Sequence, residues 1–238
     1  MDGLTGIGAT IALLLLVGGG IGLLDRRRFS PKWLLVAAAL VLLNDALLTR
    51  VYWTLPNLLP HAAWNWQGKL MALCATLAIA ALPAFGWRRS GLTLAQNKGS
   101  LPSCLVVSLL YCGFFAALTL TFPSDPGSAE DIAFQITMPG FEEEPFYRGI
   151  LLLALDRAFT GRVRFLGVDW GWGAALSCAL FGMAHAFGYA DGAFSFDPMV
   201  MALTALPSFI AVWLRLRSGS LLLPVALHNF GNSFSLFL

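Results

Sequence analysis

Charged residues are scarce in this sequence. Asp, Glu, Lys and Arg make up 12% of its 238 residues, whereas hydrophobic residues make up 58%. A soluble globular domain has roughly a quarter of its residues charged. The composition therefore excludes a chain that is mainly a soluble domain, and it predicts an integral membrane protein in contact with the lipid bilayer.

Three further features that the sequence lacks reduce the number of possible functions. The basic residues are dispersed and form no stripe that could follow a phosphate backbone, so the formal net charge of +2 gives no reason to expect a nucleic-acid partner. The four cysteines lack the spacing of metal ligands and fall in apolar segments, where cysteine is a small packing residue. The metalloprotease motif HExxH is missing.

Long apolar stretches are abundant. A membrane-spanning helix needs about 20 predominantly apolar residues. Such stretches recur near residues 4–24, 33–48, 70–87, 101–122, 132–156, 171–188, 198–214 and 219–238. We therefore expect an all-α fold, a polytopic membrane bundle of about eight transmembrane helices, with seven as the alternative because two stretches are short. Residues 1–100 would be N-terminal transmembrane helices, and residues 101–238 would form the functional core.

The basic residues also predict an orientation, because loops rich in Lys and Arg stay in the cytoplasm. Twelve of the fifteen Lys and Arg residues lie in the loops after the first, third, fifth and seventh spans. The intervening loops hold Arg50, Lys69 and several acidic residues. We therefore expect a multi-pass protein with both termini outside the cytoplasm, in a prokaryotic plasma membrane.

Three polar clusters interrupt the apolar segments of the second half. They are Glu-Glu-x-x-x-Arg at 143–148, Phe-x-x-x-His at 181–185 and His-x-x-x-Asn at 228–232. Ionisable residues inside a membrane are costly and by default functional. Carboxylates, imidazoles and an amide on separate helices are the groups needed to activate water and to stabilise an oxyanion. The clusters therefore predict a buried polar site with hydrolytic chemistry.

Glu142 precedes the first cluster and makes three consecutive glutamates with it, shortly after a Pro-Gly pair that predicts a helix restart. Glu144 and Arg148 are spaced i, i+4, so we expect them to pair. Adjacent helical positions point about 100° apart, which directs Glu143 away from this pair. A carboxylate without that partner is our candidate general base. We expect Glu142 to be solvated or to cap the helix.

The other clusters supply imidazoles and an amide. His185 by itself fits catalysis and an interhelical hydrogen bond equally well. His228 and Asn232 are four residues apart and project from one face, so both can donate to one substrate oxygen, or they can form an interhelical pair. Asn44 and Asp45 interrupt an earlier span, and they either line the same cavity or bond between helices.

These motifs, in this order across the last four spans, resemble the CAAX-protease and bacteriocin-processing family, also called the abortive-infection family. The resemblance covers about residues 100–238. It implies a helical intramembrane endopeptidase that cleaves a membrane-anchored protein or peptide, either a prenylated cytoplasmic C-terminus or an exported substrate. It also implies a water-activating pair, Glu143 and His185, an oxyanion pair, His228 and Asn232, and a supporting pair, Glu144 and Arg148.

Two alternatives stay open. Glu143, His185 and His228 also form a zinc-ligand set with one open position. We favour hydrolysis without a cofactor, because HExxH is absent and Asn232 is a poor zinc ligand. The second alternative is a non-enzymatic membrane immunity or transport protein whose polar cluster binds an ion or a partner.

Overall fold

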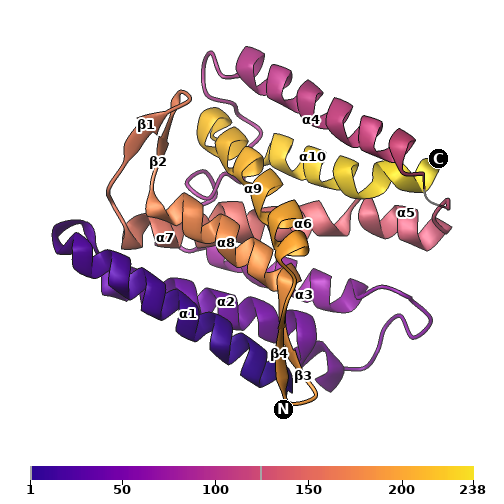
Figure 1. The fold of residues 1–238 in the computed structure, drawn as a ribbon, viewed down its shortest axis with the longest axis horizontal. Coiled ribbons are helices and arrows are strands. Elements are labelled where there is room, and N and C mark those ends of the chain that lie inside the picture. The colour runs from indigo at the N-terminus through magenta and orange to yellow at the C-terminus, as the bar shows by residue number, and fades with distance from the viewer. Residues whose placement is uncertain (1, 124) are drawn as a thin grey trace.

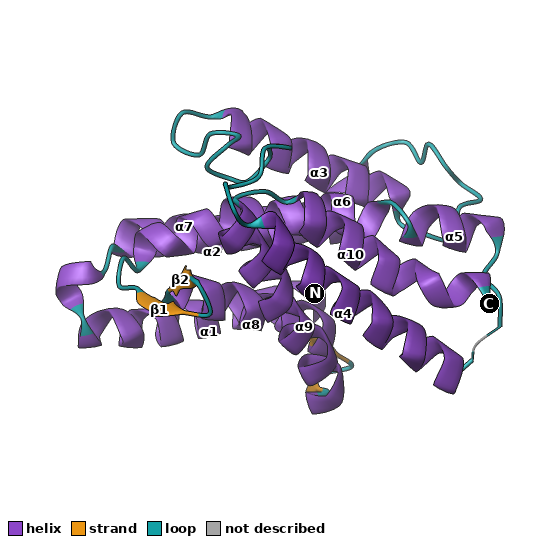
Figure 2. Ribbon diagram, turned by 90° about the horizontal axis from the view of Figure 1, so that it is seen from above, coloured by secondary structure: helices purple, strands orange, loops and turns teal. Residues whose placement is uncertain are grey.

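Helices make up most of the chain in this computed structural model, which describes residues 2–123 and 125–238 (Figure 2). The α-helices are α1 (Asp2–Leu24), α2 (Pro31–Thr49), α3 (Trp66–Ala81), α4 (Leu101–Thr121), α5 (Ala129–Gln135), α6 (Met138–Glu144), α7 (Leu152–Ala158), α8 (Trp172–Ala186), α9 (Pro198–Ser218) and α10 (Leu222–Ser233). A π-helix, Pro145–Leu151, joins α6 to α7. Short 3-10 turns lie at Arg26–Arg28, Val51–Thr54 and Phe234–Phe237.

Among the described residues, four helices are long and apolar enough to cross a membrane, namely α1, α2, α4 and α9. The apolar helices α3 and α8 are shorter. The predicted span 132–156 consists of α5, α6, the π-helix and α7 in succession, and the predicted span 219–238 contains α10. The chain is thus a mostly helical integral membrane protein, and the count of eight spans stays a prediction.

Two antiparallel β-hairpins make the all-α prediction incomplete. Strand β1 (Val163–Phe165) pairs with β2 (Val168–Trp170), and β3 (Phe187–Ala190) pairs with β4 (Ala193–Phe196). The second hairpin turns at Asp191 and Gly192, both with positive φ. An Asp-Gly pair between short aromatic runs is the usual signal of such a tight turn, and this local signal was overlooked.

The segment from α5 to α7 lies at the middle of the molecule (Figure 1). In that view α4 and α10 lie above it, and α1 and α2 lie below it. Helices α3 and α10 both pack against α6, and α8 packs against α7 and α9. Segments that are far apart in the sequence therefore meet at the element that carries the three glutamates.

Apolar side chains pack on both the inside and the outside of this bundle. A buried cluster joins α1, α2, the π-helix, α7 and α8, and includes Leu14, Leu34, Ile150, Leu155 and Leu180. Large apolar side chains also cover the outer faces of α1, α4 and α9, where many leucines are more than half exposed. An outer surface of this kind is suited to lipid, and it leaves the polar groups to the interior.

Candidate active site

A close approach of two helices places the glutamates. A helix break is present, but it lies before Pro139 rather than after the Pro-Gly pair, because α5 ends at Gln135 and α6 begins at Met138 with Pro139 in its first turn. The backbone N–H of Gly140 donates to Asn229 Oδ1 of α10 over 2.7 Å. A Cβ atom at Gly140 would lie only 2.5 Å from that oxygen. The glycine therefore allows α6 and α10 to approach closely.

The predicted pair of Glu144 and Arg148 is present, and both side chains are buried. Arg148 Nη1 lies 3.3 Å from Glu144 Oε1. Its Nη2 donates to Ser208 Oγ over 2.8 Å, and the guanidinium carbon is 4.1 Å from the ring centroid of Phe181, a cation–π contact. Arg148 lies in the π-helix, a rare element that is frequent at functional sites.

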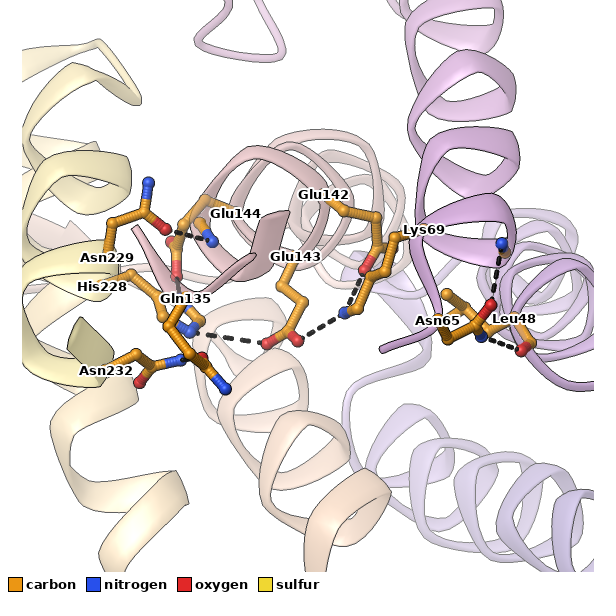
Figure 3. Close-up of polar contacts among 12 residues, drawn as sticks. Leu48, Asn65, Lys69, Gln135, Glu142, Glu143, Glu144, His228, Asn229 and Asn232 are labelled. Atoms are coloured by element: carbon orange, nitrogen blue, oxygen red, sulfur yellow. Dashed lines mark hydrogen bonds and ion pairs between the residues drawn. The ribbon is translucent and has the colours of Figure 1, made fainter. Parts of the chain in front are cut away.

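His228 joins two adjacent glutamates (Figure 3). Its Nδ1 lies 2.7 Å from Glu144 Oε1, and its Nε2 lies 3.6 Å from Glu143 Oε2. Because the Glu144 carboxylate accepts, we assign the donated proton to Nδ1. The other ring nitrogen is then directed at Glu143.

Lys69 reaches the same site from α3, although we had expected it in a loop. Its Nζ lies 2.6 Å from Glu142 Oε2 and 2.6 Å from Glu143 Oε1. Two predictions are therefore wrong: Glu142 is fully buried and ion-paired rather than solvated or capping, and Glu143 is not without a cationic partner. Three acids facing only Arg148 inside a membrane leave negative charge uncompensated. This imbalance was the signal for another cation.

His185 and Asn232 line the same cavity as Glu143. The ring Nδ1 of His185 lies 2.8 Å from the carbonyl oxygen of Phe181, which can only accept, so Nδ1 carries the proton. Asn232 Nδ2 lies 3.3 Å from Gln135 Oε1. In the described part of the chain neither residue bonds to Glu143, and His228 is the imidazole nearest to that carboxylate.

The cavity has a volume of about 530 Å³. Its polar side holds Lys69, Glu143, Glu144, His185, His228 and Asn232, and its apolar side comes largely from α4 and α9. Glu143 Oε2 is buried and has no hydrogen-bond partner among the described residues. A cavity of this size can hold a short peptide segment against that free carboxylate oxygen.

Asn44 and Asp45 do not line this cavity, although the Asn44 side chain of α2 is hydrogen-bonded to Glu142 of α6, which fits a bond between helices. Both line a separate cavity together with Tyr147 and Tyr189. Asp45 forms an ion pair with Arg50, at the end of its own helix. Of the two roles left open, a place in the catalytic cavity is thus wrong.

The zinc alternative stays a prediction. Within residues 2–123 and 125–238, no group of three or more His, Cys, Asp and Glu side chains is arranged to hold a metal ion. The ammonium of Lys69 is bound to Glu143, and a dication on the same carboxylate would be repelled by it.

A comparison with protein families matches the segment that carries most of this site. Residues 126–234 match the family model described as type II CAAX prenyl endopeptidase, Rce1-like. This segment is similar to the Rce1-like family. The Rce1-like segment contains all three motifs and lies inside the predicted core, 101–238, so the resemblance is confirmed. Lys69 lies outside it. Neither curated proteins nor solved structures gave a match.

The Rce1-like family implies a peptidase and a hydrolase, and it suggests an endopeptidase that works within the membrane. The family acts on membrane-anchored prenylated proteins. Together with the apolar helices, it also supports an integral membrane location for this chain.

Proposed function

We propose that this chain is an intramembrane endopeptidase that hydrolyses a peptide bond with water activated by Glu143, without a metal. One observation carries the proposal: Glu143 lines a cavity together with two imidazoles, and its Oε2 is buried and has no hydrogen-bond partner among the described residues. A free carboxylate oxygen in a poorly hydrated cavity is the acceptor that a general-base mechanism requires.

The two histidines suit different steps. His185 has its proton on Nδ1, so its Nε2 can accept a hydrogen bond and orient the water together with Glu143. His228 lies between two carboxylates. As an imidazolium it donates through Nε2, which suits it to the oxyanion.

Hydrolysis then follows a balanced sequence. Glu143 takes one proton from water, and the water oxygen attacks the scissile carbonyl carbon. The resulting oxyanion accepts hydrogen bonds from His228 and from the Asn232 amide, each worth roughly 3 kcal/mol where water is excluded. Glu143 returns the proton to the amide nitrogen as the C–N bond breaks, which leaves a carboxylic acid and an amine. The acid proton then passes to the amine, so the products at neutral pH are a carboxylate and an ammonium group.

The position of the cavity bears on the substrate. Trp64 and Asn65, just before α3, line it, and Lys69 lies three residues or about 4.5 Å into that helix. This end of α3 is opposite the loop that contains Arg88 and Arg89. With Arg-rich loops in the cytoplasm, the cavity lies toward the outer side of a prokaryotic plasma membrane. We therefore favour exported, membrane-anchored proteins or peptides over prenylated cytoplasmic C-termini.

The test compares purified wild type with Glu143→Gln in liposomes, with and without a chelator, on a library of membrane-anchored peptides. We expect the variant to lose at least about 100-fold in turnover and the chelator to have no effect. Asn232→Ala, at an exposed position, should slow turnover without unfolding the protein. Cleavage that the chelator abolishes would support the zinc alternative, and full activity of Glu143→Gln would reject Glu143 as the base.

A further inference from the structure

Lys69 and Glu142 contact the candidate base and belong to none of the three motifs. Lys69 also lies outside the Rce1-like segment, in the first turn of α3. Its ammonium is largely buried and touches both Glu142 and Glu143 over 2.6 Å. The site of this chain therefore contains a cation and an acid beyond those that the motifs supply.

We propose that Lys69 is a positioning residue that holds the Glu143 carboxylate for catalysis, and that Glu142 shares its ammonium. This inference rests on the function proposed above. Lys69 binds Glu143 Oε1, which leaves Oε2 as the oxygen without a hydrogen-bond partner among the described residues and thus as the proton acceptor of the proposed mechanism. Glu142 prevents the ammonium from being bound to the base alone.

The Glu143 carboxylate lies between two side chains. Lys69 of α3 holds one oxygen, and His228 of α10 lies 3.6 Å from the other (Figure 3). A glutamate side chain has several rotatable bonds, and ordering it costs conformational entropy. The ion pair with Lys69 meets part of this cost before the substrate binds, which is the purpose of preorganisation, and the His228 ring lies near the other oxygen without a bond to it.

The backbone around Lys69 is itself anchored. Asn65 caps α3 by accepting from the N–H of Gly68 over 2.9 Å. The same side chain donates to the carbonyl oxygen of Leu48 in α2 over 2.7 Å. A Cβ atom at Gly68 would lie 2.5 Å from the Asn65 amide. The first turn of α3 is thus fixed to α2, and this makes Lys69 a rigid support.

Charge balance explains why Lys69 occurs with Glu142. Glu143, Glu144, Arg148 and the His228 imidazolium of the proposed mechanism carry a formal charge of −2 + 1 + 1 = 0. Lys69 and Glu142 add +1 − 1 = 0. The two residues therefore enter the membrane interior as a neutral unit. Removing one of them leaves an unpaired buried charge, whereas removing both does not.

Because a variant without both residues keeps the buried charge unchanged, it can separate a positioning role of Lys69 from simple charge compensation. The test measures kcat, KM and the thermal midpoint of unfolding for the double variant Lys69→Met/Glu142→Gln in liposomes, beside wild type, Glu142→Gln and Glu143→Gln. We expect the double variant to melt close to wild type, with an unchanged KM and a kcat lower by roughly 100-fold, the scale of a misplaced catalytic group. Glu142→Gln keeps Lys69 and should lose far less. A double variant with wild-type kcat would overturn the inference.

Lys69→Arg provides a second test if the double variant has a much lower thermal midpoint of unfolding than wild type. This variant preserves the charge balance, but a guanidinium fork binds two carboxylates in a different geometry from an ammonium. We expect a folded protein with a lower kcat, and wild-type kcat would contradict us. The two proposals fail in different ways. Activity in Glu143→Gln, or no cleavage by folded wild type, overturns both. If wild type is active and Glu143→Gln is inactive, an unchanged kcat in the Lys69 variants overturns the role of Lys69 alone.

Discussion

Glu143 and Glu144 are neighbours in the chain but have different partners. Glu144 is bound to Arg148 and to His228 Nδ1. Glu143 is bound to Lys69 through one oxygen and keeps the other free. The difference arises because adjacent side chains diverge around a helix axis. A single residue step thus separates the carboxylate that orients an imidazole from the carboxylate that can accept a proton.

Arg148 should matter for stability as well as for activity. Removing its charge with Arg148→Met leaves Glu144 buried without its cation, and breaking a buried pair in this way costs about 3–5 kcal/mol. Denaturant titration in detergent would measure this loss. Arg148→Lys keeps the charge but not the fork that also reaches Ser208, so we expect a smaller loss. Equal stability of Arg148→Met and wild type would contradict this account.

The central segment works because it is not a continuous α-helix. The break before Met138 and the π-helix after Glu144 set the directions of side chains that a regular helix would place differently. The same segment contacts α3 on one side and α10 on the other. These irregularities therefore decide which helices the glutamates can reach.

A methyl group at Gly140 should separate α6 from α10. Gly140→Ala places a Cβ atom 2.5 Å from Asn229 Oδ1 and 2.7 Å from the Val225 carbonyl oxygen. Overpacking of this kind costs about 1–3 kcal/mol, and it should move Glu144 away from His228. We expect a lower thermal midpoint together with a lower kcat. Gly113→Ala, at an open position on α4, is the matched control, and a similar effect of both changes would argue against a specific contact.

The loop before α3 should respond to acid. The Glu130 carboxylate accepts from the backbone N–H groups of Ala63 and Trp64 and from the Trp66 indole, and these bonds lower the pKa of Glu130. Because the pKa of Glu130 is lower in the folded state, the contact stabilises the fold at pH values above the ordinary pKa of about 4.3. This stabilisation is lost as the pH falls through the pKa of the folded state.

Hydrogen exchange of residues 57–66 should therefore be slow from pH 5 to pH 7, after correction for intrinsic rates, and faster below about pH 4. Glu130→Ala removes the acceptor and should give fast exchange at every pH. Unchanged protection in this variant would show that other contacts hold the loop.

The whole site depends on helices from both halves of the chain. Lys69 comes from the N-terminal half, and the remaining polar groups come from the Rce1-like segment. Arg-rich loops lie at one end of the bundle. Trp64 and Asn65, which line the cavity, lie before α3, toward the other end. The orientation in the membrane therefore decides which proteins can reach the cavity.

Labelling with a membrane-impermeant maleimide would test the orientation. In a background without native cysteines, Asn57→Cys should react in intact cells, because its loop is expected outside. Lys98→Cys should react only after permeabilisation. Both positions are exposed in the structure, so accessibility on the protein is matched. The reverse pattern would place the cavity toward the cytoplasm and would favour cytoplasmic C-termini as substrates.

The membrane class, the three motifs and the pairing of Glu144 with Arg148 could all be predicted from the sequence. These features depend on composition and on spacing within one helix, and both are local properties. The hairpin at Asp191-Gly192 was also a local signal, although it was missed.

The partners of the other glutamates depend on the packing of the helices and could not be predicted from the sequence. Lys69 and Glu142 are 73 positions apart in the sequence, and the contact exists because α3 packs against α6. His228 bridges two glutamates because Gly140 lets α10 approach closely. Such contacts depend on how helices pack, and no pattern within a single helix encodes them.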